Sequence, residues 1–97
     1  MSLHILHDVF IKKLSAEQKH RETRNKIING ESEWVVAERQ FMIDLTQKTR
    51  KEIGFEPVEE SLILRAEREA CGHSDYSSKF ALYCAEIALT GKLPMIY

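Results

Sequence analysis

The fold of this chain is decided by the stretch Gly72-His-Ser-Asp-Tyr-Ser-Ser-Lys-Phe-Ala-Leu-Tyr-Cys-Ala-Glu-Ile-Ala-Leu-Thr-Gly-Lys-Leu-Pro94. Ser74 or Asp75 can cap the start of a helix in it, and Gly91 followed by Pro94 ends that helix. Its large apolar side chains recur at helical spacing beside a second face of small residues, in a stripe of Tyr76, Phe80, Tyr83 and Ile87. A helix that is apolar almost all the way round must be enclosed, either by the rest of its domain or in part by another protein.

Helical spacing also marks the first part of the chain, where one face carries Leu3, Leu6, Phe10 and Leu14. Ser15 stands three residues before Gln18, which is the form of a capping box and predicts a new helix or a kink at that point. The residues that follow are mostly polar, and Asn29-Gly30 is a strong stop signal.

Two more helices are predicted in the middle of the chain. Ser32 can cap the first, Gly54 is placed to end it, and Pro57 is expected in the first turn of the second. The expected core takes residues from each apolar face: Trp34, Phe41, Leu45, Leu62, Phe80, Tyr83 and Ile87. The sequence therefore predicts an all-α fold, a single domain over residues 1–97 built as an irregular bundle of four to five helices, with a short apolar tail over residues 93–97.

Composition is that of a small soluble protein. The 97 residues are 43% hydrophobic and carry a formal net charge of −1, which allows a core and gives no bulk attraction to nucleic acid or anionic lipid. The apolar runs are too short to span a bilayer, and His4, His7 and Asp8 interrupt the one at the N-terminus, so we expect neither a membrane helix nor a secretory signal. Two cysteines, Cys71 and Cys84, are too few for a disulfide framework and predict reduced thiols in a cytoplasmic protein.

Charge is unevenly distributed along the chain. Residues 56–75 have a net charge of −4, and residues 12–29 have a net charge of +4 from Lys12, Lys13, Lys19, Arg21, Arg24 and Lys26 against Glu17 and Glu22. One interpretation is two solvated faces that partly pair with each other. Another is docking on a charged partner, with Arg21, Arg24 and Lys26 as contact residues. A third is a nucleic-acid-binding factor that uses a basic helix over residues 12–26, although this segment offers no aromatic side chain on which a base could stack.

Metal and catalytic chemistry have few candidate residues. The side chains that zinc would accept are those of His4, His7, Cys71, His73 and Cys84, which suggests a small metalloprotein as a further alternative. Their spacing matches none of the usual closed zinc sites, and no residue stands out to orient a Cys71/His73 nucleophile pair. We therefore expect a protein that is not an enzyme and has no cofactor, metal or catalytic residues.

The C-terminal tail is unusually apolar, with Leu93, Pro94, Met95, Ile96 and Tyr97 in sequence. One interpretation folds it back onto its own domain. The other presents these residues to a partner, with Pro94 holding the segment extended and the Leu93–Pro94 bond able to populate both isomers.

The chain length, the glycine at each expected helix end and the stretch from Gly72 to Pro94 resemble the small early-region accessory proteins of lambdoid phages, in particular the anti-RecBCD proteins of Salmonella lambdoid phages. The resemblance implies a protein made in the cytoplasm of an infected bacterium. It implies binding to the host RecBCD helicase–nuclease, perhaps through RecC, with inhibition or modulation of the nuclease that protects phage DNA and favours phage recombination. No binding residue is carried over by position.

Overall fold

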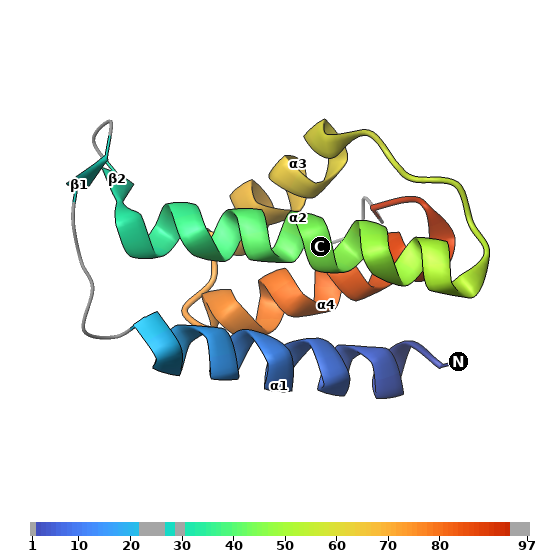
Figure 1. Cartoon of the computed structure of the whole chain (residues 1–97), viewed down its shortest axis with the longest axis horizontal. Helices are drawn as coiled ribbons and strands as arrows, with labels where there is room; N and C mark the ends of the chain where they lie inside the picture. The colour runs from blue at the N-terminus through green and yellow to red at the C-terminus, as the bar shows by residue number, and fades with distance from the viewer. Residues whose placement is uncertain (1, 22–26, 29–30, 94–97) are drawn as a thin grey trace.

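The computed structural model describes residues 2–21, 27–28 and 31–93 of the chain. Four helices form a bundle, as the sequence predicts: α1 (Leu3–Arg21), α2 (Glu33–Ile53), α3 (Glu60–Ala70) and α4 (Tyr76–Thr90). Helix α4 lies in the middle of the bundle and contacts the other three (Figure 1).

The buried side chains of α4 explain its central position. Seven of its residues are buried: Phe80, Ala81, Tyr83, Cys84, Ala85, Ile87 and Ala88. The small side chains let α1, α2 and α3 approach closely, while the aromatic rings fill the space between them. Gly91 ends the helix with φ +74°, the left-handed conformation that glycine adopts without strain.

Helix α1 contributes its predicted apolar face, on which Leu6, Phe10 and Leu14 are buried. Of the two alternatives at Ser15, a new helix or a kink, the new helix is wrong, because α1 continues through Ser15 as one helix. Gln18 lies one turn after Leu14 on the inner face, and its amide finds partners on α2 and α4.

Sequence analysis missed two short strands between α1 and α2. Strand β1 (Ile27–Ile28) pairs antiparallel with β2 (Glu31–Ser32), with Ile27 opposite Ser32. The Asn-Gly dipeptide between these segments in the sequence is the signal that could have found them, because it is the commonest dipeptide of two-residue hairpin loops.

Helix α2 ends as predicted. Gly54 has φ +103°, and the N–H groups of Phe55 and Gly54 donate to the carbonyls of Arg50 and Lys51 at 2.8 and 3.1 Å. This paired arrangement is a Schellman motif, which satisfies two carbonyls that the helix itself leaves open.

Helix α3 begins three residues later than predicted, at Glu60, so Pro57 lies in the connection before the helix. The side chain of Gln47 explains the later start. Its Nε2 donates to the carbonyl of Val58 at 2.7 Å, and its Oε1 accepts from the N–H of Val58 at 3.1 Å. Both main-chain groups of Val58 are therefore bonded to α2 and not to a helical turn.

The predicted core is confirmed in four of its seven members: Leu45, Phe80, Tyr83 and Ile87 are buried. Phe41 and Leu62 are half-buried against them, and the side chain of Trp34 lies outside the part that the structure describes. Met42 and Ile63 are fully buried residues that the prediction left out.

Candidate functional site

The exposed side of α1 is the candidate docking surface. Five residues at helical spacing are all exposed on it, and we call this set the outer face of α1: Ile5, Val9, Lys12, Ala16 and Lys19. Ile5 is 57% exposed and Val9 36%, although the opposite face of the same helix is buried. The helix therefore presents apolar side chains on two sides, and only one of these sides is covered by its own domain.

The charges on α1 are mainly positive. Lys12, Lys13 and Lys19 are exposed, and Lys12 forms an exposed ion pair with Asp8 at 3.0 Å. An exposed ion pair of this kind contributes little to stability, so pairing with Asp8 does not account for the presence of several lysines on α1.

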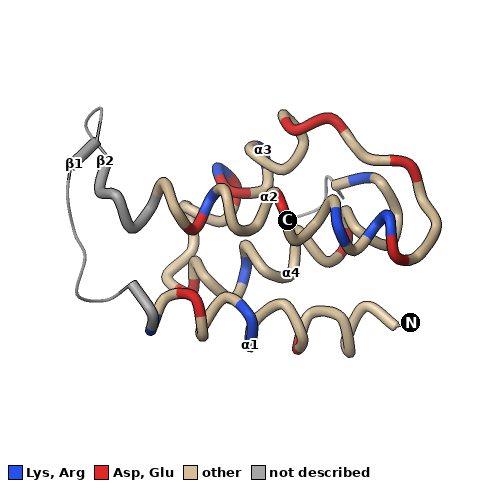
Figure 2. Tube along the Cα trace, viewed as in Figure 1, with Lys and Arg blue, Asp and Glu red and all other residues tan. Residues whose placement is uncertain are grey.

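Figure 2 shows acidic residues gathered in the α2–α3 connection and the start of α3, at the opposite edge of the bundle from α1. Glu56, Glu59 and Glu60 are exposed there. Among the side chains that the structure describes, the exposed lysines of α1 form no ion pair with these three glutamates.

Several predicted contact residues fall outside the described part. Arg21 is the last residue of α1, and its side chain is not described. The following residues lie entirely outside the described part: Arg24, Lys26, Pro94, Met95, Ile96 and Tyr97.

Leu93 requires a correction, because it is 7% exposed and belongs to the core cluster. Its side chain is covered by its own domain and is not presented to a partner. Of the two interpretations of the tail, the folded-back one therefore holds for this first residue.

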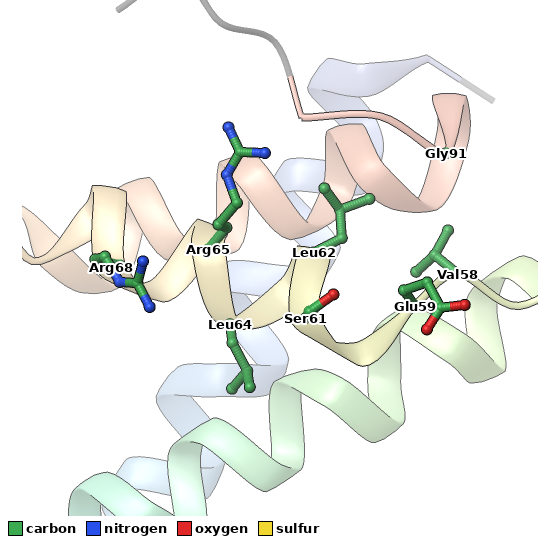
Figure 3. Close-up of a pocket in the computed structure, with 8 residues that line it drawn as sticks. All are labelled: Val58, Glu59, Ser61, Leu62, Leu64, Arg65, Arg68 and Gly91. Atoms are coloured by element: carbon green, nitrogen blue, oxygen red, sulfur yellow. The ribbon is translucent and has the colours of Figure 1, made fainter.

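A groove of about 580 Å³ runs along α3 (Figure 3). It is lined by Val58, Glu59, Ser61, Leu62, Leu64, Arg65, Arg68 and Gly91. Arg65 and Arg68 are exposed, and Figure 3 shows Leu62 and Leu64 pointing to opposite sides of α3. A second groove of about 530 Å³ lies beside Phe55, whose ring is covered by the Arg50 guanidinium at 5.1 Å from its centroid.

The candidate metal ligands do not converge. Within the described residues, no group of three or more His, Cys, Asp or Glu side chains is placed to hold a metal ion. His7 Nε2 lies 3.1 Å from the carbonyl oxygen of Ser78, whereas His73 Nε2 lies 3.3 Å from the hydroxyl of Tyr83. Cys71 is exposed, while burial raises the pKa of the Cys84 thiol to about 12 and keeps it protonated.

Sequence reasoning missed a group that we call the polar cluster, in which Glu38 is buried and Gln18 and Ser77 are half-buried. The Gln18 amide donates to Glu38 Oε1 and, at 2.9 Å, to Ser77 Oγ, so it joins α1 to α2 and α4. Glu38 is 1% exposed, and burial raises the pKa of its carboxyl, with a further upward contribution from the charge of Glu67. No signal in the sequence marks this glutamate, because charged residues are almost always placed at the surface.

A second buried carboxylate lies beside the polar cluster. Glu67 of α3 accepts from Arg39 Nε at 2.7 Å and from the Tyr76 hydroxyl at 3.4 Å. Burial, followed by the charge of Glu67, raises the pKa of Tyr76, so this phenol stays protonated.

In the part of the chain that the structure describes, no helix is both long and apolar enough to cross a membrane. Comparison of the chain with protein-family models, with curated proteins and with solved structures found no match.

Proposed function

We propose that this chain acts by binding another protein, with the outer face of α1 as its docking surface. The observation that carries the proposal is the exposure of Ile5 and Val9 one turn apart on a helix whose other face is fully covered. Interfaces are centred on apolar side chains that become dry on binding, and two neighbouring aliphatic residues supply such a centre.

The lysines of α1 indicate the charge of the partner. Lys12 and Lys19 belong to the same outer face, and Lys13 is exposed beside them. A positive rim around an apolar centre favours an acidic partner surface, because complementary charge accelerates association and disfavours other partners.

The resemblance to lambdoid-phage accessory proteins supplies a specific partner. We propose that the chain binds the RecBCD helicase–nuclease in the cytoplasm of the bacterial host, perhaps through RecC, and modulates its nuclease activity. This role requires a docking surface and no catalytic residue.

Binding to purified RecBCD tests the proposal. We expect the wild-type chain to bind the enzyme and to change its degradation of linear duplex DNA. The double variant Ile5→Ser/Val9→Ser should weaken binding about tenfold or more, since two interface anchors each contribute on the order of 1 kcal/mol. Its melting temperature should stay unchanged, because both side chains are exposed.

The matched control is Ile53→Ser, which removes an apolar side chain of similar exposure, 37%, at the end of α2. It should leave binding unchanged. If the wild-type chain does not bind RecBCD, this partner is ruled out. If the wild type and the double variant bind with equal affinity, the outer face of α1 is not part of the interface.

Direct nucleic-acid binding is the second candidate, and the exposed lysines of α1 favour it. Neutralising phosphates releases counterions, so this function predicts that affinity for bare duplex DNA falls steeply as salt is raised. Lys13→Glu/Lys19→Glu should then abolish DNA binding, whereas Ile5→Ser/Val9→Ser should leave it intact.

A further inference from the structure

The two parts of α1 are attached to the bundle by different kinds of contact. Up to Leu14 the inner face is apolar, with Leu6 and Phe10 also buried. Among residues 15–19 no apolar side chain is buried, and the amide of Gln18 bonds to side chains of both α2 and α4. Polar contacts therefore contribute to holding this part of α1 in place.

That partner, Glu38, is an incompletely satisfied acid. Its Oε1 accepts from Gln18, and within the described residues its buried Oε2 has no hydrogen-bond partner. A neutral carboxyl carries a proton on one oxygen and tolerates a buried position in which one oxygen has no hydrogen-bond partner. An ionised carboxylate with a bare oxygen costs several kcal/mol in a buried position.

On balance the surroundings of Glu38 disfavour its ionised form, and only the hydrogen bond from Gln18 favours it. From α3 the charge of Glu67 acts on Glu38, and from α4 the protonated phenol of Tyr76 lies within electrostatic range of it. Ser77 of α4 accepts from the same Gln18 amide. Helix α1 supplies the uncharged amide of Gln18, and on α2 the neighbouring Arg39 is ion-paired with Glu67. The pKa of Glu38 is raised by burial first and by Glu67 second, with the Gln18 hydrogen bond acting in the opposite direction.

We propose that the polar cluster is a proton-controlled attachment, in which residues 15–19 of α1 stay on α2 and α4 while Glu38 is protonated and detach when it loses its proton to solvent. Detachment lets water reach the buried carboxylate. Leu6, Phe10 and Leu14 keep the first part of the helix in place. The inference rests on the proposed function to the extent that it describes regulation of the docking helix, because Ala16 and Lys19 of the outer face lie in the detaching part.

Amide hydrogen exchange of the chain alone tests the proposal. It is measured from about pH 5 to about pH 9, the range in which carboxyl groups with a raised pKa titrate. Protection is expressed relative to the intrinsic exchange rate at each pH. We expect the protection of amides 16–19 to fall about tenfold or more as pH rises, while that of amides 8–11 changes less. Glu38→Gln, which keeps the shape and cannot ionise, should abolish the fall. Glu69→Gln, which removes an exposed carboxyl from α3, should leave it unchanged.

A carbon-detected NMR titration of the wild-type side-chain carboxyls provides a second measurement that needs no variant. The midpoint for Glu38 should lie above the usual glutamate value and coincide with the midpoint of the loss of protection. The proposal is overturned if Glu38 titrates as an ordinary glutamate, if α1 loses protection uniformly, or if Glu38→Gln shows the same fall. These measurements need no partner protein. The proposed attachment can therefore be disproved while docking through Ile5 and Val9 stands, and docking can be disproved while the attachment stands.

Discussion

Arg50 of α2 donates from its Nη1 to the main-chain carbonyl of Ile87 in the last turn of α4, at 3.1 Å. The same nitrogen lies 3.2 Å from the carbonyl of Ala88, and Nε donates to the carbonyl of Glu56 at 2.6 Å. The carbonyl of Ile87 also accepts from the N–H of Gly91 at 2.8 Å, so the guanidinium is a second donor to Ile87 and bonds Ala88 beside it. Through Glu56 the same side chain also fixes the connection between α2 and α3. Its positive charge also lies at the negative end of the α4 dipole.

Arg50→Met should lower the free energy of unfolding by about 2–3 kcal/mol, because methionine keeps the aliphatic stem but removes the hydrogen bonds to the carbonyls of Glu56 and Ala88 and one of the two to Ile87. Urea unfolding followed by circular dichroism measures the loss. Lys51→Met, an exposed neighbour, is the control and should change the free energy by less than about 0.5 kcal/mol. Equal stability of the two variants would mean that water replaces the guanidinium at no cost.

Gly91→Ala should cost about 1–2 kcal/mol, because alanine is strained at φ +74° and its Cβ would lie 3.4 Å from both terminal nitrogens of Arg50. The matched control is Gly72→Ala, where φ is not positive and the nearest atom is the Glu69 carbonyl oxygen at 3.6 Å. Thermal unfolding of the two variants should differ clearly. A Gly72→Ala variant as unstable as Gly91→Ala would exclude backbone strain as the cause.

Apolar spacing predicted α1, α2 and α4 because a period of 3.6 residues decides which side of a helix faces inward. It did not predict the start of α3, because the main chain of Val58 is bonded to Gln47, a residue far along another helix. The polar cluster was missed for the same reason. Gln18 and Glu38 are residue types usually found at the surface, and only their tertiary neighbours make Glu38 buried and Gln18 half-buried.

The candidate docking surface was only partly predictable. The basic residues of α1 were visible in the sequence, whereas the exposure of Ile5 and Val9 was not. An aliphatic residue beside an apolar stripe fits the edge of the core or the surface equally well. The position of α4 relative to α1 decides between them.

Glu38→Gln should raise the stability of the chain at neutral pH, and the gain should shrink as pH falls. The raised pKa of Glu38 means that the folded chain binds this proton more tightly than the unfolded chain. Its favourable contribution is complete below the unfolded pKa and is lost as pH rises through the folded pKa. Because glutamine does not titrate, the variant avoids that loss.

Melting temperatures of wild type and Glu38→Gln at about pH 5, 7 and 8 measure this effect, with Glu69→Gln as the exposed-carboxyl control. The difference between wild type and Glu38→Gln should widen with pH, while Glu69→Gln follows the wild type. A difference that is constant across pH would show that Glu38 is already ionised throughout this range.

Leu93→Ala should lower the free energy of unfolding by about 2–4 kcal/mol, because Leu93 is buried in the core cluster just after the end of α4. Lys92→Ala, at an exposed neighbour, is the control and should be near neutral. Chemical unfolding gives the stability, and binding to RecBCD is measured well below the melting temperature of each variant. We expect folded Leu93→Ala to bind as the wild type does, since its side chain faces its own domain. A variant that keeps its stability but loses binding would assign Leu93 to the interface.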